Sequence, residues 1–358
     1  MAADELRVAV IGFGMGGRVF HTQLIEATPG LRVATIVTSD PGRQADARSR
    51  HPGAAVVAGA DAVWSAADDH DLVVVTTPNV SHVPLALAAL GAGLPVVVDK
   101  PMAPSSAAGE DIVAEAERRG LLLSVFQSRR WDGDFLTIRR LLGQGAVGPV
   151  VRFESRFERW RPERNGAAWR ELGAPGEAGG LLFDIGSHLI DQAMVLFGRP
   201  SSVYAEVDRR RAGAEVDDDT FVALSHPGGE RSHLWASVTT RLLGPRLRVL
   251  GLEGAYVKHG LDPQEDALAS GSDPASATWG REPEEGWGTI ADAAGERAVE
   301  TDLGDYPAYY AGIATSLREG IAPPVDARDS IDGLRVIEAA ARSARDGVVV
   351  DLDWELDR

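Results

Sequence analysis

The feature that most constrains the fold is an apolar stretch that runs directly into a glycine-rich loop. Residues 6–11 (LRVAVI) precede residues 12–17 (GFGMGG), and an amphipathic pattern (19–25) and a second apolar stretch (31–37) follow. A strand without polar positions suits the buried centre of a parallel sheet. The spacing Gly12-x-Gly14-x-x-Gly17 permits a tight turn, a close approach to a pyrophosphate and close packing of the next helix. This context predicts a dinucleotide-binding β-α-β unit, and the alternative is an ordinary strand-to-helix turn.

The same alternation continues to about residue 125. Further strands are expected at 71–76, 94–98 and 121–125, and helices at 83–90 and from Ser105 or Ser106 to Arg119. A serine at the start and Gly120 past the end are typical helix boundaries. Repeated β-α-β units imply a doubly wound parallel sheet with helices on both faces. We therefore predict a Rossmann domain over residues 1–125.

Beyond this point the pattern favours a mostly antiparallel sheet. The strands expected there are 150–157, 202–207, 220–224, 233–239, 247–252 and 348–352. Helices are expected at 181–197 and 329–345, and the second of these could pack back on the first domain. The stretch 262–285 is rich in Asp, Glu, Gly, Ser and Pro, which predicts a long surface excursion. Residues 126–358 are thus expected to form a second, α/β domain.

Composition argues against several classes of protein and partner. The chain has 358 residues, a formal net charge of -17 and no cysteine. An acidic surface disfavours nucleic acid as a partner, and the lack of cysteine excludes disulfides and thiolate metal sites. The sequence has no signal-peptide pattern and no uncharged stretch of membrane-spanning length. We therefore expect a cytoplasmic protein without a membrane partner.

Polar residues follow two of the expected parallel strands. Thr77-Pro78-Asn79 and Asp99-Lys100-Pro101 come directly after the strands at 71–76 and 94–98. Ligands of open α/β sheets lie beyond the carboxyl ends of the strands. There the ammonium group of Lys100 could stabilise an alkoxide as a hydride leaves its carbon. The alternative is a solvated surface lysine, because most lysines are exposed.

A second polar cluster lies on the helix expected at 181–197. Asp184, His188 and Asp191 have the spacing i, i+4, i+7, which places them on one helical face. A histidine there can accept a hydroxyl proton near neutral pH, and a nearby carboxylate can orient the ring or hold a substrate hydroxyl. The alternatives are an Asp184 that favours the helix dipole, a His188 buried in the core, and a metal site made of the histidine and the carboxylates. We predict no metal, because a hydride donor needs none.

Taken together, these motifs resemble those of a known enzyme family. Gly12-x-Gly14-x-x-Gly17, Asp99-Lys100-Pro101 and Asp184-x-x-x-His188 resemble the Gfo/Idh/MocA oxidoreductases over essentially the whole chain. The family's usual Glu-Lys-Pro reads Asp-Lys-Pro here. Within the family the chain is similar to the scyllo-inositol dehydrogenase-like branch. The segments that carry this similarity are 17–21, 129–132, 180–198, 256–264 and 306–310.

The resemblance implies a Rossmann domain followed by an α/β domain with a large, open, mostly antiparallel sheet, whose outer face serves association into homodimers or homotetramers. It also implies transfer of a hydride between a nicotinamide cofactor and a secondary alcohol or ketone of a sugar or cyclitol. Lys100 would be the catalytic lysine, Asp184 the substrate-orienting carboxylate and His188 the general acid/base. The residues expected to contact the cofactor are Gly12, Phe13, Gly14, Met15, Gly17, Ser39, Arg43, Thr77, Pro78, Asn79, His82 and Asp99. Those expected to contact the substrate are Trp131, Arg159 and Tyr309.

The end of the second strand bears on the choice between NADP and NAD. An NAD-preferring Rossmann fold usually has an acidic residue there, on the ribose 2′-hydroxyl, but the chain has Thr38 at that position. Ser39 could donate to a 2′-phosphate and Arg43 could pair with it. Asp40 opposes this interpretation if it points inward. We predict NADP as the preferred cofactor, with NAD as the alternative.

Two other functions compete with a dehydrogenase or reductase. A non-catalytic NADP-binding redox sensor would bind the cofactor without turnover, but it has no need of Lys100, Asp184 and His188 together. A lyase or hydrolase that oxidises its substrate transiently would need further acid/base residues, which the sequence does not identify. The sequence leaves open which sugar or cyclitol is the substrate, because fold does not determine function.

Overall fold

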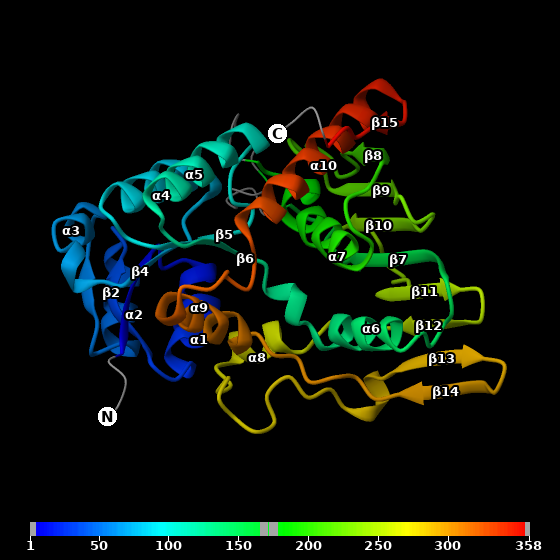
Figure 1. Ribbon diagram of the computed structural model, residues 1–358, viewed down its shortest axis with the longest axis horizontal. Coiled ribbons are helices and arrows are strands. Elements are labelled where there is room, and N and C mark those ends of the chain that lie inside the picture. The colour runs from blue at the N-terminus through cyan, green and yellow to red at the C-terminus, as the bar shows by residue number, and fades with distance from the viewer. Residues whose placement is uncertain (1–4, 165–170, 172–177, 355–358) are drawn as a thin grey trace. The chain divides into compact units, whose positions relative to one another are not determined.

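The predicted alternation of strands and helices forms a parallel sheet in the N-terminal part of the chain (Figure 1). The computed structural model describes residues 5–164, 171 and 178–354. Among these, six strands pair in the order β3-β2-β1-β4-β5-β6. They are β1 (Leu6–Ile11), β2 (Leu31–Val37), β3 (Ala55–Val57), β4 (Leu72–Val75), β5 (Val96–Asp99) and β6 (Leu123–Phe126). Val8–Val10 and all of β4 are inaccessible to solvent. Since burying one valine-sized side chain contributes about 1.5–3 kcal/mol, these central strands form the core that supports the glycine loop.

Helices cover both faces of this sheet. α4 lies beside α5 on one face, and α1 packs against α9 on the other (Figure 1). Ser105 caps α5 by accepting a hydrogen bond from the N–H of Ala108 at 3.2 Å, as its position in the sequence predicts. The helical segments are η1 (Gly16–His21), α1 (Thr22–Ala27), α2 (Pro41–Arg50), α3 (Asp61–Trp64), η2 (Ala67–Asp69), η3 (Asn79–Ser81), α4 (His82–Gly91), α5 (Ser106–Arg119), η4 (Ser128–Trp131), α8 (Gln264–Ser270) and α9 (Pro307–Glu319).

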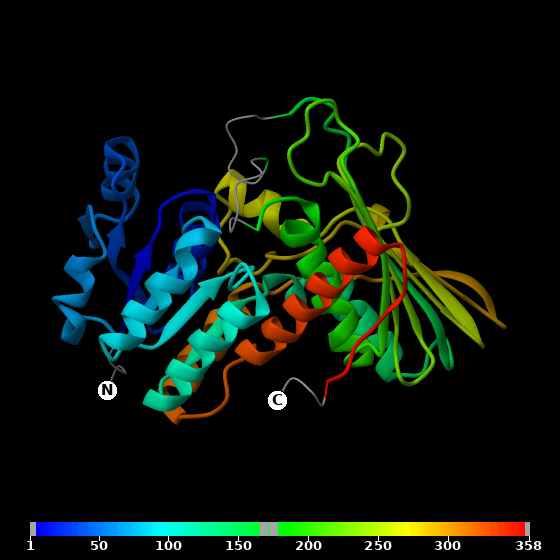
Figure 2. The same cartoon turned by 90° about the horizontal axis from the view of Figure 1, so that it is seen from above.

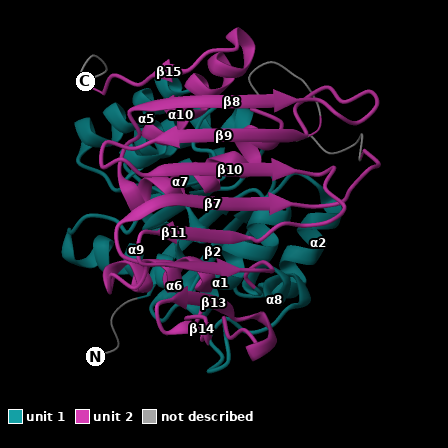
Figure 3. Ribbon diagram, turned by 90° about the vertical axis from the view of Figure 1, so that its right-hand side faces the viewer, with its two compact units in different colours: residues 1–131, 263–279, 305–331 teal, residues 132–262, 280–304, 332–358 magenta. Residues whose placement is uncertain are grey.

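The contacts of the chain define two compact units, which differ from the predicted division at residue 125 (Figure 3). The first unit comprises residues 1–131, 263–279 and 305–331, and the second comprises the rest. Two late segments join the first unit because α8 packs on η1 and α9 packs on α1. The helix expected at 329–345 is α10 (Ala327–Asp346), whose residues belong to the first unit up to Ile331 and to the second unit after it. Its predicted return to the first domain stays a prediction.

The second unit is built on a sheet that is mostly antiparallel, as predicted. In the described part of the chain nine strands pair in the order β14-β13-β12-β11-β7-β10-β9-β8-β15. All neighbouring pairs are antiparallel except β7 with β10. The strands are β7 (Val150–Glu158), β8 (Ser202–Asp208), β9 (Asp219–Ser225), β10 (Arg231–Ser237), β11 (Leu247–Gly251), β12 (Gly254–Lys258), β13 (Gly288–Asp292), β14 (Gly295–Val299) and β15 (Val350–Asp351).

The helices of this unit lie on one face of its sheet. Figure 2 shows the sheet nearly edge-on with the helices on one side, and Figure 3 shows its other face in front, where no helix of the described residues crosses the strands. α7 packs against β7 and β10. The helical segments are α6 (Gly133–Gly143), η6 (Leu182–Gly186), α7 (Ser187–Phe197) and η7 (Glu284–Gly286).

The expected surface excursion at 262–285 is partly wrong. It contains α8, and Leu268 and Trp279 are buried in the core of the first unit. The amide oxygen of Gln264 accepts hydrogen bonds from Trp279 Nε1 at 2.8 Å and from the N–H of Tyr306 at 2.7 Å. Two buried side chains and the hydrogen bonds of Gln264 thus fix a segment whose composition is otherwise that of a loop. Within the described ranges, no helix has the length and hydropathy needed to cross a membrane.

Candidate functional site

The glycine loop joins β1 to η1 and has no room for larger side chains at two of its positions. Gly12 has φ of 106°, and a Cβ there would lie 2.6 Å from the carbonyl oxygen of Thr76. A Cβ at Gly17 would lie 2.1 Å from the carbonyl oxygen of Gly12. At Gly14, by contrast, the nearest atom is Arg43 Nη1 at 3.9 Å. The loop is therefore packed tightly on the sheet at Gly12 and Gly17, while Gly14 faces open space where a ligand can approach.

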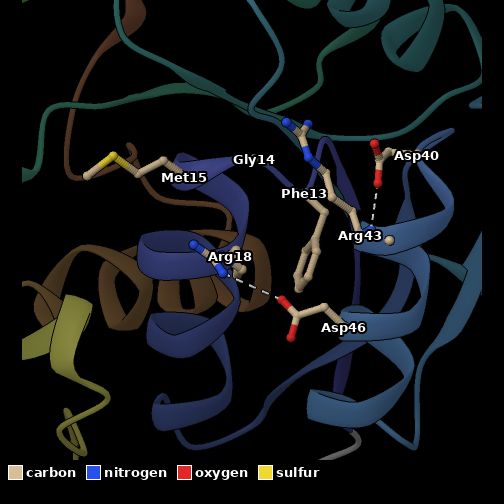
Figure 4. Close-up of a pocket in the computed structure, with 8 residues that line it drawn as sticks. Phe13, Gly14, Met15, Arg18, Asp40, Arg43 and Asp46 are labelled. Carbon is tan, nitrogen blue, oxygen red and sulfur yellow. Dashed lines mark hydrogen bonds and ion pairs between the residues drawn. The ribbon is translucent and has the colours of Figure 1, made fainter. Parts of the chain in front are cut away.

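A pocket of about 440 Å³ opens between this loop and α2 (Figure 4). Arg18 and Asp46 point toward each other across it, with Arg18 Nη1 3.7 Å from Asp46 Oδ2. Asp46 also accepts a hydrogen bond from Arg50 Nε at 2.8 Å. The pocket is lined by Phe13, Gly14, Met15, Arg18, Asp40, Gly42, Arg43 and Asp46. A backbone cradle with cationic side chains at its rim fits the phosphate groups of a dinucleotide.

Asp40 has a structural role at the start of α2. Its carboxylate caps α2 by accepting a hydrogen bond from the N–H of Arg43 at 2.8 Å. Ser39 and Arg43 are both exposed, and Thr38 is buried at the end of β2. The Asp40 carboxylate is thus engaged by the helix end, and the Arg43 side chain extends toward Gly14 (Figure 4).

The turn after β4 holds the second group of predicted cofactor contacts. Thr77 is half-buried, Pro78 is exposed and Asn79 is buried. His82 has ring nitrogens 2.8 Å from the carbonyl oxygen of Thr77 and 2.9 Å from that of Pro101. Its side chain therefore links this turn to the Lys100 turn by backbone contacts, and its burial lowers its pKa.

Asp99 and Lys100 end β5, and the Lys100–Pro101 peptide bond is cis. Lys100 is half-buried. The carboxylate of Asp99 accepts hydrogen bonds from the N–H of Lys100 at 2.8 Å and from Thr76 Oγ1 at 3.1 Å. Its Oδ2 also lies 3.5 Å from Nε2 of His21. These contacts hold the Asp99 carboxylate in place beside the predicted catalytic lysine.

In the second unit, the predicted acid/base cluster does not lie on one regular α-helix. Asp184 belongs to η6, which is π-helical and is wound with i→i+5 hydrogen bonds, whereas His188 and Asp191 belong to α7. The predicted i, i+4, i+7 face is therefore interrupted at Asp184, although His188 and Asp191 remain one α-helical turn apart. His188 and Asp191 are each 6% exposed, and Asp184 is half-buried.

Asp217 holds the start of this helical segment. Its carboxylate accepts a hydrogen bond from the N–H of Leu182 at 2.7 Å, and its carbonyl accepts one from the N–H of Leu181 at 3.2 Å. Gly180 has φ of 90°, and a Cβ there would lie 2.0 Å from Asp217 Oδ1. Burial raises the pKa of Asp217 to about 6.

The predicted substrate contacts have unlike environments. Tyr309 is fully buried in the core of the first unit, and its hydroxyl donates to Ser124 Oγ at 3.0 Å, so its predicted contact with substrate stays a prediction. Trp131 packs against it edge-on. Arg159, in the second unit, is half-buried, with its guanidinium 4.7 Å from the centre of the Phe157 ring.

Sequence reasoning missed several residues that the geometry brings to these sites. They are Arg18, His21, Asp46, Asp217 and Tyr310. Arg18 and His21 lie within the segment 17–21, and Tyr310 lies within the segment 306–310; both segments carry the family resemblance but indicate no role for these side chains. Asp46 and Asp217 have no local pattern that separates them from other surface carboxylates, because their neighbours come from elsewhere in the chain.

Comparison with known proteins agrees with this architecture. Residues 6–127 match the model of the oxidoreductase family's NAD-binding Rossmann fold, and residues 139–352 match the model of its C-terminal alpha/beta domain. The "uncharacterized oxidoreductase YdgJ" of Escherichia coli (strain K12) is 39% identical, over 96% of this chain and 97% of its own. The scyllo-inositol 2-dehydrogenase (NADP(+)) IolW of Bacillus subtilis (strain 168) is 35% identical, over 98% of this chain and 97% of its own.

The solved structures give the same picture. The structure of the oxidoreductase yvaA from Bacillus subtilis has a TM-score of 0.92 and 34% identity, and the match covers 98% of this chain and 99% of that one. Both family models and full-length relatives thus account for the two sheets and their order along the chain. The chain therefore belongs to the Gfo/Idh/MocA oxidoreductase family.

Proposed function

We propose that the protein is an NADP-dependent dehydrogenase or reductase that acts on a secondary alcohol or ketone of a cyclitol or sugar. The observation that carries the cofactor preference is the arrangement at the end of β2. Asp40 is engaged as the cap of α2, while Arg43 extends into the pocket toward Gly14. A guanidinium in this place can pair with a 2′-phosphate. The proposed substrate class rests on the full-length relative IolW, named as a scyllo-inositol 2-dehydrogenase.

Each polar residue then has a chemical task. A nicotinamide cofactor bound at the glycine loop would supply or accept the hydride. Lys100 stabilises the negative charge that develops on the substrate oxygen. His188 takes the hydroxyl proton during oxidation and returns it during reduction, which is chemistry that an imidazole side chain can perform. Asp184 orients the substrate hydroxyl.

Replacement of Arg43 tests the cofactor assignment. We expect Arg43→Ala to weaken NADPH binding by about tenfold or more, because a charge-assisted hydrogen bond is lost, and to leave NADH binding almost unchanged. Calorimetric titration of both cofactors measures this difference. Arg48→Ala, an exposed arginine on the same helix outside the pocket lining, is the matched control. Equal losses for NADPH and NADH would contradict the assignment.

Replacement of His188 tests the proposed chemistry. His188→Ala should lower turnover by about 100-fold or more, since general acid–base catalysis contributes that much, while cofactor affinity is kept. The exposed His259 provides the control variant His259→Ala in the same unit. If His188→Ala turns over substrate at the rate of the control, His188 is not the acid/base.

We also propose that the chain forms homo-oligomers through the helix-free face of its nine-stranded sheet. This face carries an aromatic group, in which the Phe221 and Trp235 rings lie 5.1 Å apart and the Phe221 and His233 rings 5.7 Å apart. The guanidinium of Arg156 lies 3.9 Å from the centre of the Trp235 ring. Aromatic residues and arginine are enriched in protein interfaces, which supports association through this surface.

A further inference from the structure

The residue before Lys100 is held by the glycine-loop helix. Asp99 Oδ2 lies 3.5 Å from His21 Nε2, and a Cβ at Gly16 would lie 2.8 Å from the same oxygen. His21 and Gly16 are the last and first residues of η1. One helical segment therefore touches the Asp99 carboxylate with both of its ends.

The π-helical winding of η1 makes this double contact feasible. In an α-helix with 3.6 residues per turn, residues five apart point in clearly different directions. In a π-helix, whose i→i+5 hydrogen bonds widen each turn, residues five apart lie much closer to one face than in an α-helix. Gly16 and His21 thus share the face of η1 that lies on Asp99, and the absence of a side chain at Gly16 lets the helix approach closely.

The His21 ring is itself fixed on every side. It is inaccessible to solvent, and its centre lies 4.4 Å from that of the Phe126 ring. Its Nδ1 lies 2.6 Å from the hydroxyl of Tyr310, a fully buried residue of α9. A ring that accepts from Tyr310 at Nδ1 carries its proton on Nε2, the nitrogen that faces Asp99.

We propose that His21 is a positioning residue for Lys100, which acts by holding the Asp99 carboxylate that in turn accepts from the Lys100 N–H. The inference rests on the proposed catalytic role of Lys100. Burial alone raises the pKa of Asp99, but its interactions with the His21 ring 3.5 Å away and with His82 and Lys100 keep that pKa well below its usual range. The carboxylate therefore stays ionised as an acceptor, and the lysine backbone stays in one place relative to the glycine loop.

Two amide substitutions separate the two contacts of the ring. The amide nitrogen of Gln reaches the position of Nε2, so His21→Gln keeps a donor for Asp99 and loses the Tyr310 contact. His21→Asn places its amide near Nδ1 and loses the contact with Asp99. His21→Leu loses both contacts. We expect His21→Leu and His21→Asn to lower kcat by about tenfold or more, because small displacements of a reacting group are costly. The Kd for NADPH should change by less than about twofold, and His21→Gln should recover most of kcat.

His70 provides the matched control. It is 7% exposed in the same unit and is held by Thr35 Oγ1 at 2.8 Å and by the carbonyl oxygen of Ala66 at 3.0 Å. It lies before the amino end of β4, whereas Lys100 follows the carboxyl end of β5. His70→Leu should lower the melting temperature like His21→Leu and leave kcat unchanged.

A readout that does not depend on turnover separates this inference from the proposed function. Hydrogen exchange of the Lys100 amide should quicken in His21→Leu and His21→Asn, but not in His21→Gln or His70→Leu. If the wild-type protein turns over no cyclitol or sugar, the proposed function fails, and the exchange rates still decide the inference. Unchanged exchange of the Lys100 amide and unchanged kcat in His21→Leu would overturn the inference. Recovery of kcat by His21→Asn instead of His21→Gln would overturn it as well.

Discussion

At the scale of single residues, the glycine loop combines positions that serve packing with one that serves binding. Gly17 has no room for a Cβ, whereas a Cβ at Gly14 would lie 3.9 Å from Arg43 Nη1, in ordinary van der Waals contact. We expect Gly17→Ala to lower the free energy of unfolding by about 1–3 kcal/mol through overpacking. Gly14→Ala should leave it nearly unchanged and should weaken the binding of both NADPH and NADH, because its methyl group occupies the approach of the phosphates. Urea unfolding measures the first effect and calorimetric titration measures the second. A Gly17→Ala protein as stable as the wild type, or a Gly14→Ala protein that binds both cofactors as tightly as the wild type, would contradict these predictions.

Asp217 makes stability depend on pH in an unusual direction. Its folded-state pKa of about 6 lies above the ordinary 3.8. Between these values the folded protein retains a proton that the unfolded chain has released, so stability falls as pH rises through about pH 4 to 6. Asp217→Asn can still accept from Leu182 but does not titrate. The difference in unfolding free energy between the wild-type protein and Asp217→Asn should therefore change across this window. Parallel curves of unfolding free energy against pH for the two proteins would rule out the raised pKa of Asp217.

The sequence predicted the residues of the Lys100 turn but not their surroundings. Lys100 could be found because a strand pattern and a proline frame it. His21 and Asp217 could not, because what matters in each case is a contact with a residue far along the chain. The surroundings of Tyr309 were unpredictable for the same reason, since a sequence motif does not reveal that its hydroxyl turns toward Ser124 in the core.

At the scale of elements, the cap of α2 distinguishes a structural aspartate from a ribose ligand. We expect Asp40→Ala to cost about 1 kcal/mol of stability, because the N–H of Arg43 loses its acceptor. Asp40→Asn preserves the cap and should preserve both stability and NADH affinity. Thermal unfolding with and without NADH measures both quantities. A selective loss of NADH affinity in Asp40→Asn would show that the carboxylate binds the ribose after all.

The elements themselves were predictable where their apolar pattern is strong. The strands β1, β2 and β4 and the helix α5 were predicted to within about a residue at each end. α2 was missed because Ala47 is its one buried residue, which leaves no apolar stripe to recognise. The π-helical winding of η1 and η6 has no local signature, since each segment lies in a sequence that an α-helix would also accept.

At the scale of the whole molecule, self-association through the helix-free face of the nine-stranded sheet can be tested by a substitution that introduces one charged side chain there. Trp235→Asp places a carboxylate within the aromatic group and should convert the protein to the mass of a single chain in sedimentation velocity, since desolvating an unpaired charge is costly. Leu252→Asp, at a residue 74% exposed next to β11, is the control and should keep the wild-type mass. A wild-type protein that sediments as one chain would contradict the proposal.

The order of strands was the part of the architecture that the sequence could not supply. Repeated β-α-β units implied the parallel sheet, and turn spacing implied the antiparallel one. The central place of β7, between β11 and β10, depends on pairings between segments far apart along the chain. The return of α8 and α9 to the first unit also depends on tertiary contacts.

The most direct test of the account is turnover of the purified protein with NADP+ and with NAD+ on a panel of inositols and aldoses, followed by the absorbance of the reduced nicotinamide. The account predicts oxidation of at least one cyclitol or sugar, with kcat/KM at least about tenfold higher for NADP+ than for NAD+, since the 2′-phosphate contact is charge-assisted. It also predicts loss of that activity in His188→Ala. Binding of NADPH without turnover of any substrate in either direction would contradict the account and would favour a redox sensor.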